Sequence, residues 1–305
     1  MKKLIIIECP SNLGLKAPAK GKVPGVWQLP DVMRENGFHK KIAPDEVHTI
    51  IAPAYTLEKD RATGLLNCRS LVHYAKLQAS LIAPMFAQKH LPIVIGGDCS
   101  ILVGVALALR KAGNYALFYL DGHTDFMDVR LSETGGMGGV AAYFVTGNGY
   151  AGISNIDGHS PYINEENLWC VGNREYDDEY ENQIRGSSAT YIRLSKLRIA
   201  GIERCASAFL KMIENKNLDG FFLHIDVDVL NDNIMPCVDS RNPDGLYYPE
   251  FNKLCGMLFS SEKFAGVEIT ILDPDLDTGA VFTNLFIENF TRTFLTAISP
   301  VSFPR

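Results

Sequence analysis

The stretch YALFYLDGHTD, residues 115–125, decides the fold. Its first six residues are apolar or aromatic, as in a buried strand, and Asp121, His123 and Asp125 follow where that strand would end. In proteins with an open α/β sheet, ligands bind at the carboxyl ends of parallel strands. We therefore predict a buried parallel strand that carries metal-binding side chains at its end.

A second acidic pair follows another apolar run, residues 221–225. Because side chains alternate along a strand, His224, Asp226 and Asp228 are expected on one face. The four aspartates of the two stretches would repel one another at neighbouring strand ends unless cations neutralise them. Carboxylates with imidazole suit Mn²⁺, whereas more nitrogen or sulfur suits Zn²⁺ or Fe²⁺. The pattern therefore predicts two divalent metal ions.

Hydrophobic periodicity predicts that strands and helices alternate along the chain, which implies a parallel sheet with right-handed crossovers. Strands are predicted at residues 4–7, 47–51, 91–95, 115–120, 168–171, 221–227 and 266–272. Helices are predicted at residues 25–35, 70–90, 101–111, 202–216 and 280–298. Since 305 residues with 47% hydrophobic content can build one large core, and no repeat or linker interrupts them, we expect a single domain over residues 1–305.

The composition argues against some classes of binding partner. A net charge of −6 and a pI near 5.7, without a basic run, argue against nucleic acid and anionic membranes. No apolar run approaches the ~18 residues that span a bilayer, and the run at residues 4–7 is too short for a signal peptide. The seven scattered cysteines lack the spacing of a disulfide framework or a zinc ribbon. These features favour a cytoplasmic protein that acts on a small molecule.

Three blocks of the chain, each after a strand-like run, resemble the arginase/agmatinase (ureohydrolase) superfamily in sequence and in order. They are GGDCS at residues 96–100, DGHTD at residues 121–125 and DVD at residues 226–228. The looser likeness extends over almost the whole chain. It implies a three-layer α/β/α fold with a mostly parallel, roughly eight-stranded sheet, a small nitrogenous substrate and a homo-oligomer.

The resemblance also implies a set of metal ligands for two ions, with Mn²⁺ the expected metal. Asp121 and Asp226 match the aspartates that bridge the ions, and Asp125 matches a ligand of one ion. His123 and Asp228 match ligands of the other ion. Five of the six family ligands are thus present at matching positions.

Two further residues near these ligands differ from the family. Cys99 stands where the family has its sixth ligand, a histidine. It is either a thiolate ligand that favours Zn²⁺ or Fe²⁺, or a small buried apolar side chain. His224 stands where the family commonly has serine. It orients a ligand carboxylate, supplies a proton, or is an ordinary core histidine.

The substrate side of the site also departs from the family pattern. Met137 replaces a histidine thought to shuttle protons, and Ile271 replaces a glutamate that grips the guanidinium group. On a regular strand, Glu268 would face the side opposite to Ile271 and could not substitute for that glutamate. Glu175 and Asp177 either hold an amine of the substrate or belong to a solvated acidic loop. These departures disfavour hydrolysis of arginine or agmatine.

The function that the resemblance implies is hydrolysis of a C–N bond other than a peptide bond. Two ions would activate a hydroxide that attacks a guanidino, amidine or amide carbon, and Asp125 would pass a proton to the departing nitrogen. Amide hydrolysis at a single metal, as in deacetylases of similar fold, is one alternative. A catalytically silent relative that keeps its metal is another.

Overall fold

The computed structural model describes residues 2–174 and 177–298. Within these residues, eight strands form one sheet in the order β2-β1-β3-β8-β7-β4-β5-β6, and every neighbouring pair is parallel. The strands are β1 (Leu4–Glu8), β2 (Glu46–Thr49), β3 (Leu91–Ile95), β4 (Tyr115–Leu120), β5 (Leu168–Val171), β6 (Thr190–Ile192), β7 (Gly220–Asp226) and β8 (Phe264–Thr270). The predicted parallel α/β sheet is therefore confirmed.

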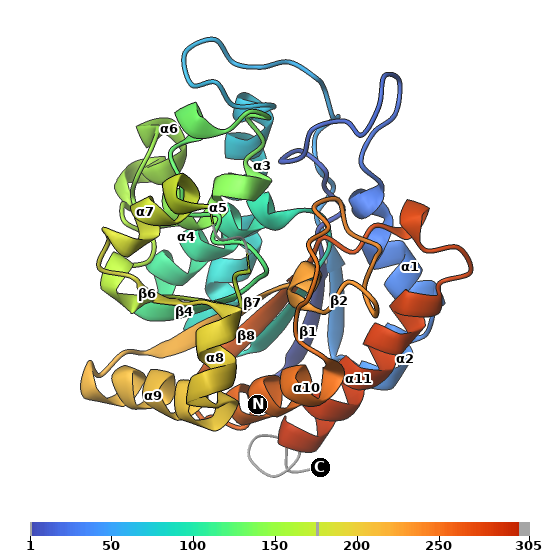
Figure 1. The fold of residues 1–305 in the computed structure, drawn as a ribbon, viewed down its shortest axis with the longest axis vertical. Coiled ribbons are helices and arrows are strands. Elements are labelled where there is room, and N and C mark those ends of the chain that lie inside the picture. Colours follow the sequence, from blue (N-terminus) through green and yellow to red (C-terminus); the bar gives the residue numbers. More distant parts are fainter. Residues whose placement is uncertain (1, 175–176, 299–305) are drawn as a thin grey trace.

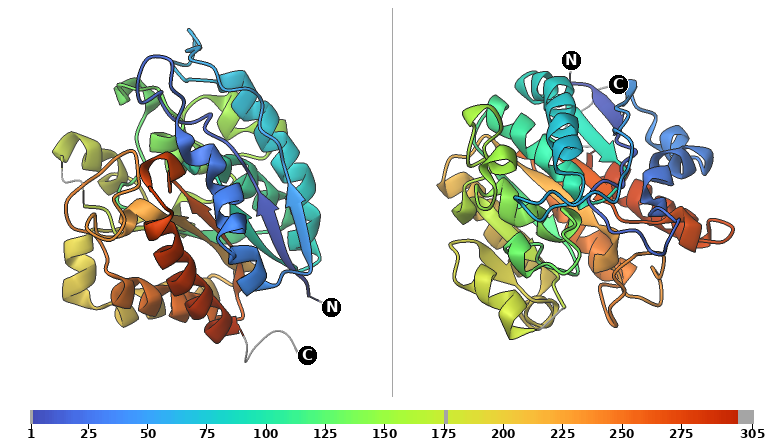
Figure 2. Two further views of the ribbon diagram at one scale, coloured as in Figure 1. Left: turned by 90° about the vertical axis from the view of Figure 1, so that its right-hand side faces the viewer. Right: turned by 90° about the horizontal axis from the view of Figure 1, so that it is seen from above.

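Helices cover both faces of the sheet and complete the predicted three layers (Figures 1 and 2). The long helices α3 and α4 pack together on one face, while α1, α2 and α8 to α11 lie on the other. The helices of the described residues are α1 (Leu29–Glu35), α2 (Phe38–Ile42), α3 (Cys68–Ala87), α4 (Leu102–Ala112), α5 (Ala141–Val145), α6 (Ala151–Ser154), α7 (Asp178–Arg185), α8 (Leu194–Ala200), α9 (Ile202–Asn215), α10 (Tyr248–Phe259) and α11 (Val281–Ile298). Among them, no helix is long and apolar enough to cross a membrane.

The central strands are buried on both faces, which explains their continuous apolar sequences. All five residues of β3 and all seven of β7 are buried. Helix α9 shows how the outer layer is fixed, because Cys205, Phe209 and Ile213 recur at helical spacing and are buried. The Phe209 ring makes edge-to-face contacts with Phe118 of β4 and Phe221 of β7.

The strand order brings together segments that lie far apart in the chain. Strand β8 is the last in sequence, yet it lies between β3 and β7. The carboxyl ends of β3, β8, β7 and β4 are therefore neighbours at one edge of the sheet. The loops that follow these four strands form the candidate site.

Candidate metal centre

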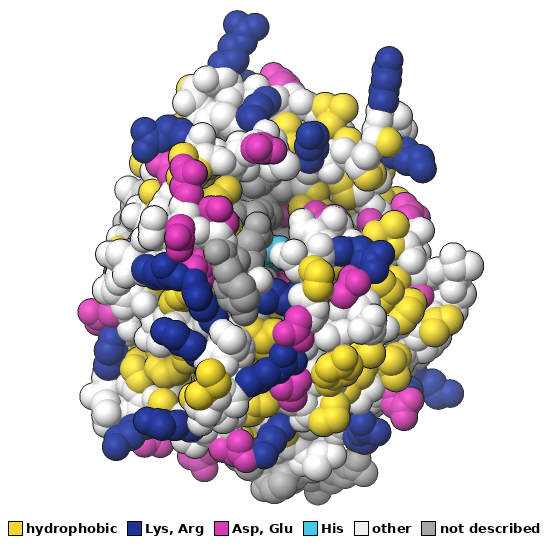
Figure 3. Space-filling model, viewed as in Figure 1, with side chains coloured by type: hydrophobic (Ala, Val, Ile, Leu, Met, Phe, Trp, Pro, Cys, Tyr) yellow, Lys and Arg dark blue, Asp and Glu magenta, His cyan; other side chains and the backbone are white. Residues whose placement is uncertain are grey.

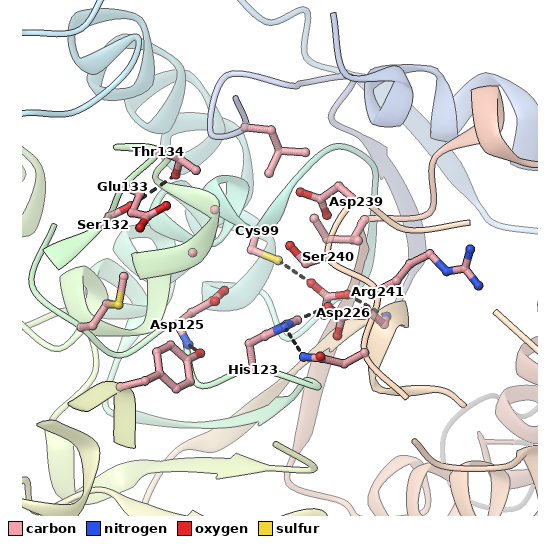
Figure 4. A pocket seen from close by; sticks show the side chains of 18 of the residues that line it. Cys99, His123, Asp125, Ser132, Glu133, Thr134, Asp226, Asp239, Ser240 and Arg241 are labelled. Atoms are coloured by element: carbon pink, nitrogen blue, oxygen red, sulfur yellow. Dashed lines mark hydrogen bonds and ion pairs between the residues drawn. The ribbon is translucent and has the colours of Figure 1, made fainter. Parts of the chain in front are cut away.

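A cavity of about 440 Å³ opens at this edge of the sheet. Cys99, His123, Asp125, Asp226 and Asp228 lie on its wall. Figure 3 shows the hollow in the molecular surface with a histidine visible inside it, and Figure 4 shows the side chains converging from opposite sides. The structure thus brings together residues that the sequence places in three separate blocks.

The turn after β4 holds Asp121 at the bottom of the site. Its Oδ1 accepts a hydrogen bond from the backbone N–H of His123 at 2.6 Å. Its Oδ2 is buried and has no hydrogen-bond partner among the described residues. The N–H of Gly122 donates to Asp228 Oδ1 at 2.9 Å, and a Cβ at Gly122 would lie 2.2 Å from Arg174 Nη1. A side chain at this position would therefore displace the Arg174 guanidinium group.

The end of β7 positions the second acidic pair. Asp226 Oδ1 accepts a hydrogen bond from the N–H of Asp228 at 2.8 Å, which folds the chain into a tight turn. Asp226 Oδ2 accepts a hydrogen bond from the Cys99 thiol at 3.0 Å. The thiol also lies 3.4 Å from the hydroxyl of Thr270, at the end of β8. Cys99 thus points into the site and contacts a predicted metal ligand.

His123 lies between the two strand ends. Its Nδ1 is 2.8 Å from Asp228 Oδ2 and 3.7 Å from Asp121 Oδ1. Its Nε2 is 3.2 Å from the amide nitrogen of Asn242. Asn242 belongs to a loop that lines the cavity, and no local pattern of residues indicated this contact.

Asp125 has a different set of contacts. Its backbone is left-handed, with φ of 45°, and its Oδ2 accepts a hydrogen bond from the Tyr119 hydroxyl. The Tyr180 hydroxyl accepts hydrogen bonds from the backbone N–H groups of Thr124, at 2.6 Å, and Asp125, at 3.3 Å. These contacts fix the direction in which the Asp125 carboxyl group lies on the cavity wall.

His224 is fully buried behind this wall. Its Nδ1 lies 2.5 Å from Glu268 Oε1, and its ring stacks on Tyr119 with centroids 4.1 Å apart. The expectation that Glu268 faces away from the site assumed a regular strand through Ile271. That assumption is wrong, because β8 ends at Thr270 and Ile271 has φ of 76°, which breaks the alternation. Glu268 therefore lies beside the site, while Ile271 lines the cavity.

Two groups of donor atoms could hold metal ions, and in each group the atoms lie within 4.8 Å of one another. The first group is Cys99, Asp121, His224 and Asp226, and the second is Asp121, His123 and Asp228. Asp121 belongs to both. Asp125 belongs to neither, and Asp226 belongs to one. The groups overlap the predicted ligands and add His224.

The electrostatics of the cluster favour a bound cation. Burial raises the pKa of Asp226 well above its usual value, and the charges of Asp228 and Asp121 raise it further. Burial and Asp226 likewise raise the pKa of the Cys99 thiol. Burial also opposes ionisation of Asp228, but His123 and Arg174 lower the pKa of Asp228 to about 2. A divalent ion would stabilise the charged forms, so these residues fit a metal site.

Two of the predicted substrate residues, Met137 and Asp177, are not part of the cavity wall. Met137 is fully buried. Asp177 caps helix α7 by accepting a hydrogen bond from the N–H of Tyr180 at 3.0 Å. Glu175 lies outside the described residues.

Sequence reasoning missed Tyr119, Asn242 and the contact of Glu268 with His224. Of these, only Tyr119 could have been found from the sequence. It precedes Asp121 by two residues, so the alternation of side chains along a strand predicts that both lie on one face.

Comparisons with known proteins agree with the fold and show the family. The family model described as "Arginase family" matches residues 15–296. The arginase of Staphylococcus aureus (strain COL) is 25% identical over 285 residues, which cover 91% of this chain and 92% of the relative.

Solved structures show the same fold. The arginase of Bacillus caldovelox superposes with a TM-score of 0.86 at 22% identity, covering 96% of this chain and 98% of that one. The formimidoylglutamase of Bacillus subtilis superposes with a TM-score of 0.75 at 20% identity, covering 99% of this chain and 89% of that one. With the family model matching nearly the whole chain, we conclude that this protein is a member of the arginase family.

Proposed function

We propose that this protein is a hydrolase that depends on two divalent metal ions and cleaves a C–N bond of a small guanidino, amidine or amide compound. One observation carries the proposal: two groups of metal-binding atoms share Asp121 beside a cavity large enough for such a substrate. Membership of the arginase family supports the reaction class.

The residues of the chain have separable tasks in this reaction. Asp121, Asp226, Asp228 and His123 would hold the ions. When bound, two such ions supply the Lewis acidity that makes water reactive at neutral pH. We assign proton transfer to Asp125, because it lies on the cavity wall and Tyr119 fixes its orientation.

The cavity wall suggests which substrates fit. Ile271 offers an apolar surface where a guanidinium cation would need a carboxylate partner. A neutral planar group, such as an amide, loses less hydration there. Figure 4 shows Glu133 and Asp239 on opposite walls of the cavity. We therefore propose a substrate with a neutral reacting group and an amine at its far end, held at this acidic rim.

The proposal also covers the cellular compartment, the oligomeric state and the metals. All seven cysteines lie in the described residues and are free and buried, which suits a reducing compartment such as the cytoplasm. We extend the family likeness to a homo-oligomer. For the metals, Mn²⁺ is expected where carboxylates dominate, and Zn²⁺ or Fe²⁺ where Cys99 takes part.

The proposal is tested by assaying every metal with every class of substrate. Metal-free protein is reconstituted with Mn²⁺, Zn²⁺, Fe²⁺, Co²⁺ or Ni²⁺ and assayed with guanidino compounds, amidines and acylated amines. Released amine, ammonia or urea is measured, and bound metal is counted in the same samples. Turnover that requires metal, with acylated amines ahead of amidines and arginine, is expected.

Two results would contradict the proposal. Retention of two ions without turnover of any substrate would identify a silent metal-binding relative. Turnover with one ion per chain would replace the two-ion mechanism with the single-metal alternative.

A further inference from the structure

His224 lies beside the acidic cluster and carries a buried ring nitrogen that has no hydrogen-bond partner among the described residues. His224 is 0% exposed, and its Nε2 has no hydrogen-bond partner among the described residues. A donor atom of its ring lies within 4.8 Å of donor atoms of Cys99, Asp121 and Asp226. We propose that His224 binds a metal ion directly through Nε2, in a site completed by these three residues. This inference rests on the metal centre of the proposed function and goes beyond it in assigning a ligand.

The contacts on the other side of the His224 ring orient it for metal binding through Nε2. The Glu268 carboxyl group lies 2.5 Å from Nδ1. In the tautomer that carries its proton on Nδ1, the ring donates a hydrogen bond to Glu268 Oε1 and the lone pair is on Nε2. Glu268 is the register partner of His224 on the neighbouring strand, so the sheet itself holds the pair. Stacking on Tyr119 fixes the plane of the ring. A carboxylate behind a histidine is the arrangement that orients metal-binding imidazoles.

A purely structural role explains the arrangement less well. His224 and Glu268 are both fully buried, and Nε2 of the histidine and Oε2 of the glutamate lack partners among the described residues. Each unsatisfied buried polar atom destabilises the folded state, whereas two apolar side chains would pack here without that loss. A cation bound at Nε2 would give one of these two unpaired atoms a partner. It also neutralises Asp121 and Asp226 beside it.

The donor atoms of this site differ from those of its neighbour. Nitrogen, sulfur and two carboxylates surround the first ion, whereas one imidazole and carboxylates surround the second. The first set favours Zn²⁺, Fe²⁺ or Co²⁺, and the second is better suited to Mn²⁺. The thiol of Cys99 releases its proton to solvent as the sulfur binds the ion. The centre is therefore inferred to be asymmetric, with a softer ion beside His224.

The test uses Co²⁺ as a visible probe with the full-length protein. Metal-free protein is titrated with Co²⁺, and the thiolate-to-cobalt charge-transfer band in the near ultraviolet is followed with the metal content. The central variant is His224→Asn, whose amide nitrogen replaces Nδ1 toward Glu268 but supplies nothing at Nε2. Cys99→Ser removes the sulfur, while Cys170→Ser removes another buried cysteine, which is outside both donor groups.

We expect two bound ions and the charge-transfer band for the unaltered protein and for Cys170→Ser. His224→Asn should bind the first ion at least about tenfold more weakly, and Glu268→Gln should weaken it by roughly ten- to a hundredfold. Cys99→Ser should lose the band. Circular dichroism and thermal unfolding of the metal-free variants check that the fold persists.

The outcomes separate this inference from the proposed function. If the unaltered protein and folded His224→Asn bind two ions with equal affinity and equal spectra, His224 is not a ligand, although the metal centre stands. If the unaltered protein binds no ion, both proposals are overturned.

Discussion

At the scale of single residues, two unusual side chains of the site approach the same aspartate. The Cys99 thiol contacts Asp226, and a ring nitrogen of His224 lies within 4.8 Å of a donor atom of Asp226. The convergence of the aspartates could be predicted, because the carboxyl ends of parallel strands meet at one edge. The pairing of His224 with Glu268 could not, since it joins residues 44 positions apart and depends on the register of β7 with β8.

Asp121 is the residue on which both donor groups depend. Asp121→Asn keeps the size of the side chain but removes the shared charge, so we expect binding of both ions to fall sharply. The metal-free variant should be at least as resistant to heat as the unaltered protein, because burial and Asp228 already raise the pKa of Asp121 and disfavour its charged form. Metal content and melting temperature check this, and two firmly bound ions in the variant would contradict it.

Ile271 determines whether the cavity accepts a guanidinium group. It lines the cavity with φ of 76°, a region that β-branched residues rarely adopt. Ile271→Glu introduces a carboxylate there, and a charge-assisted hydrogen bond of about 1.5–3 kcal/mol should tighten guanidinium binding by roughly ten- to a hundredfold. Calorimetric titration with a guanidino compound measures this change. Ile271→Gln is the neutral control, and equal affinity in the two variants would refute the prediction.

At the scale of elements, periodicity predicted most strands and the longest helices, but it missed β6 and the 12-residue helix α10. The helix expected at residues 70–90 is α3 (Cys68–Ala87), and the strand expected at residues 168–171 is β5. Strand β6 was missed because it has three half-buried residues, too few to show alternation. The strand expected at residues 266–272 ends early because a turn follows Thr270.

The turn between β3 and Cys99 has strict backbone requirements. Gly97 has φ of 64°, and a Cβ there would lie 2.7 Å from the carbonyl oxygen of Ser11. Gly97→Ala should therefore destabilise the protein by about 2 kcal/mol or more and weaken the metal site that contains Cys99. Urea unfolding and Co²⁺ titration measure the two effects.

Gly139→Ala is the matched control for that substitution. A Cβ at Gly139 meets no atom within 4 Å, so a change within about 0.5 kcal/mol is expected. Equal stability of the two variants would show that the turn after β3 tolerates a side chain.

At the scale of the whole molecule, folding gathers carboxyl groups whose charged forms a bound cation would stabilise. Ligand binding to the native state stabilises it by about 4 kcal/mol at a thousandfold excess over Kd. The melting temperature should therefore rise by several degrees when Mn²⁺ or Zn²⁺ replaces a chelator. Scanning calorimetry tests this, with Asp121→Asn as the control that should not respond. An unchanged melting temperature for the unaltered protein would contradict a stoichiometric metal centre.

The alternation of strands and helices indicated a parallel sheet, but no local pattern revealed the strand order. The position of β8 between β3 and β7 has a consequence for synthesis on the ribosome. Until residues 264–270 have emerged, β3 and β7 cannot occupy their final places, and the nascent polypeptide lacks Glu268 and Thr270 behind His224 and Cys99. We therefore expect stable capture of metal at this site only after β8 has been synthesised.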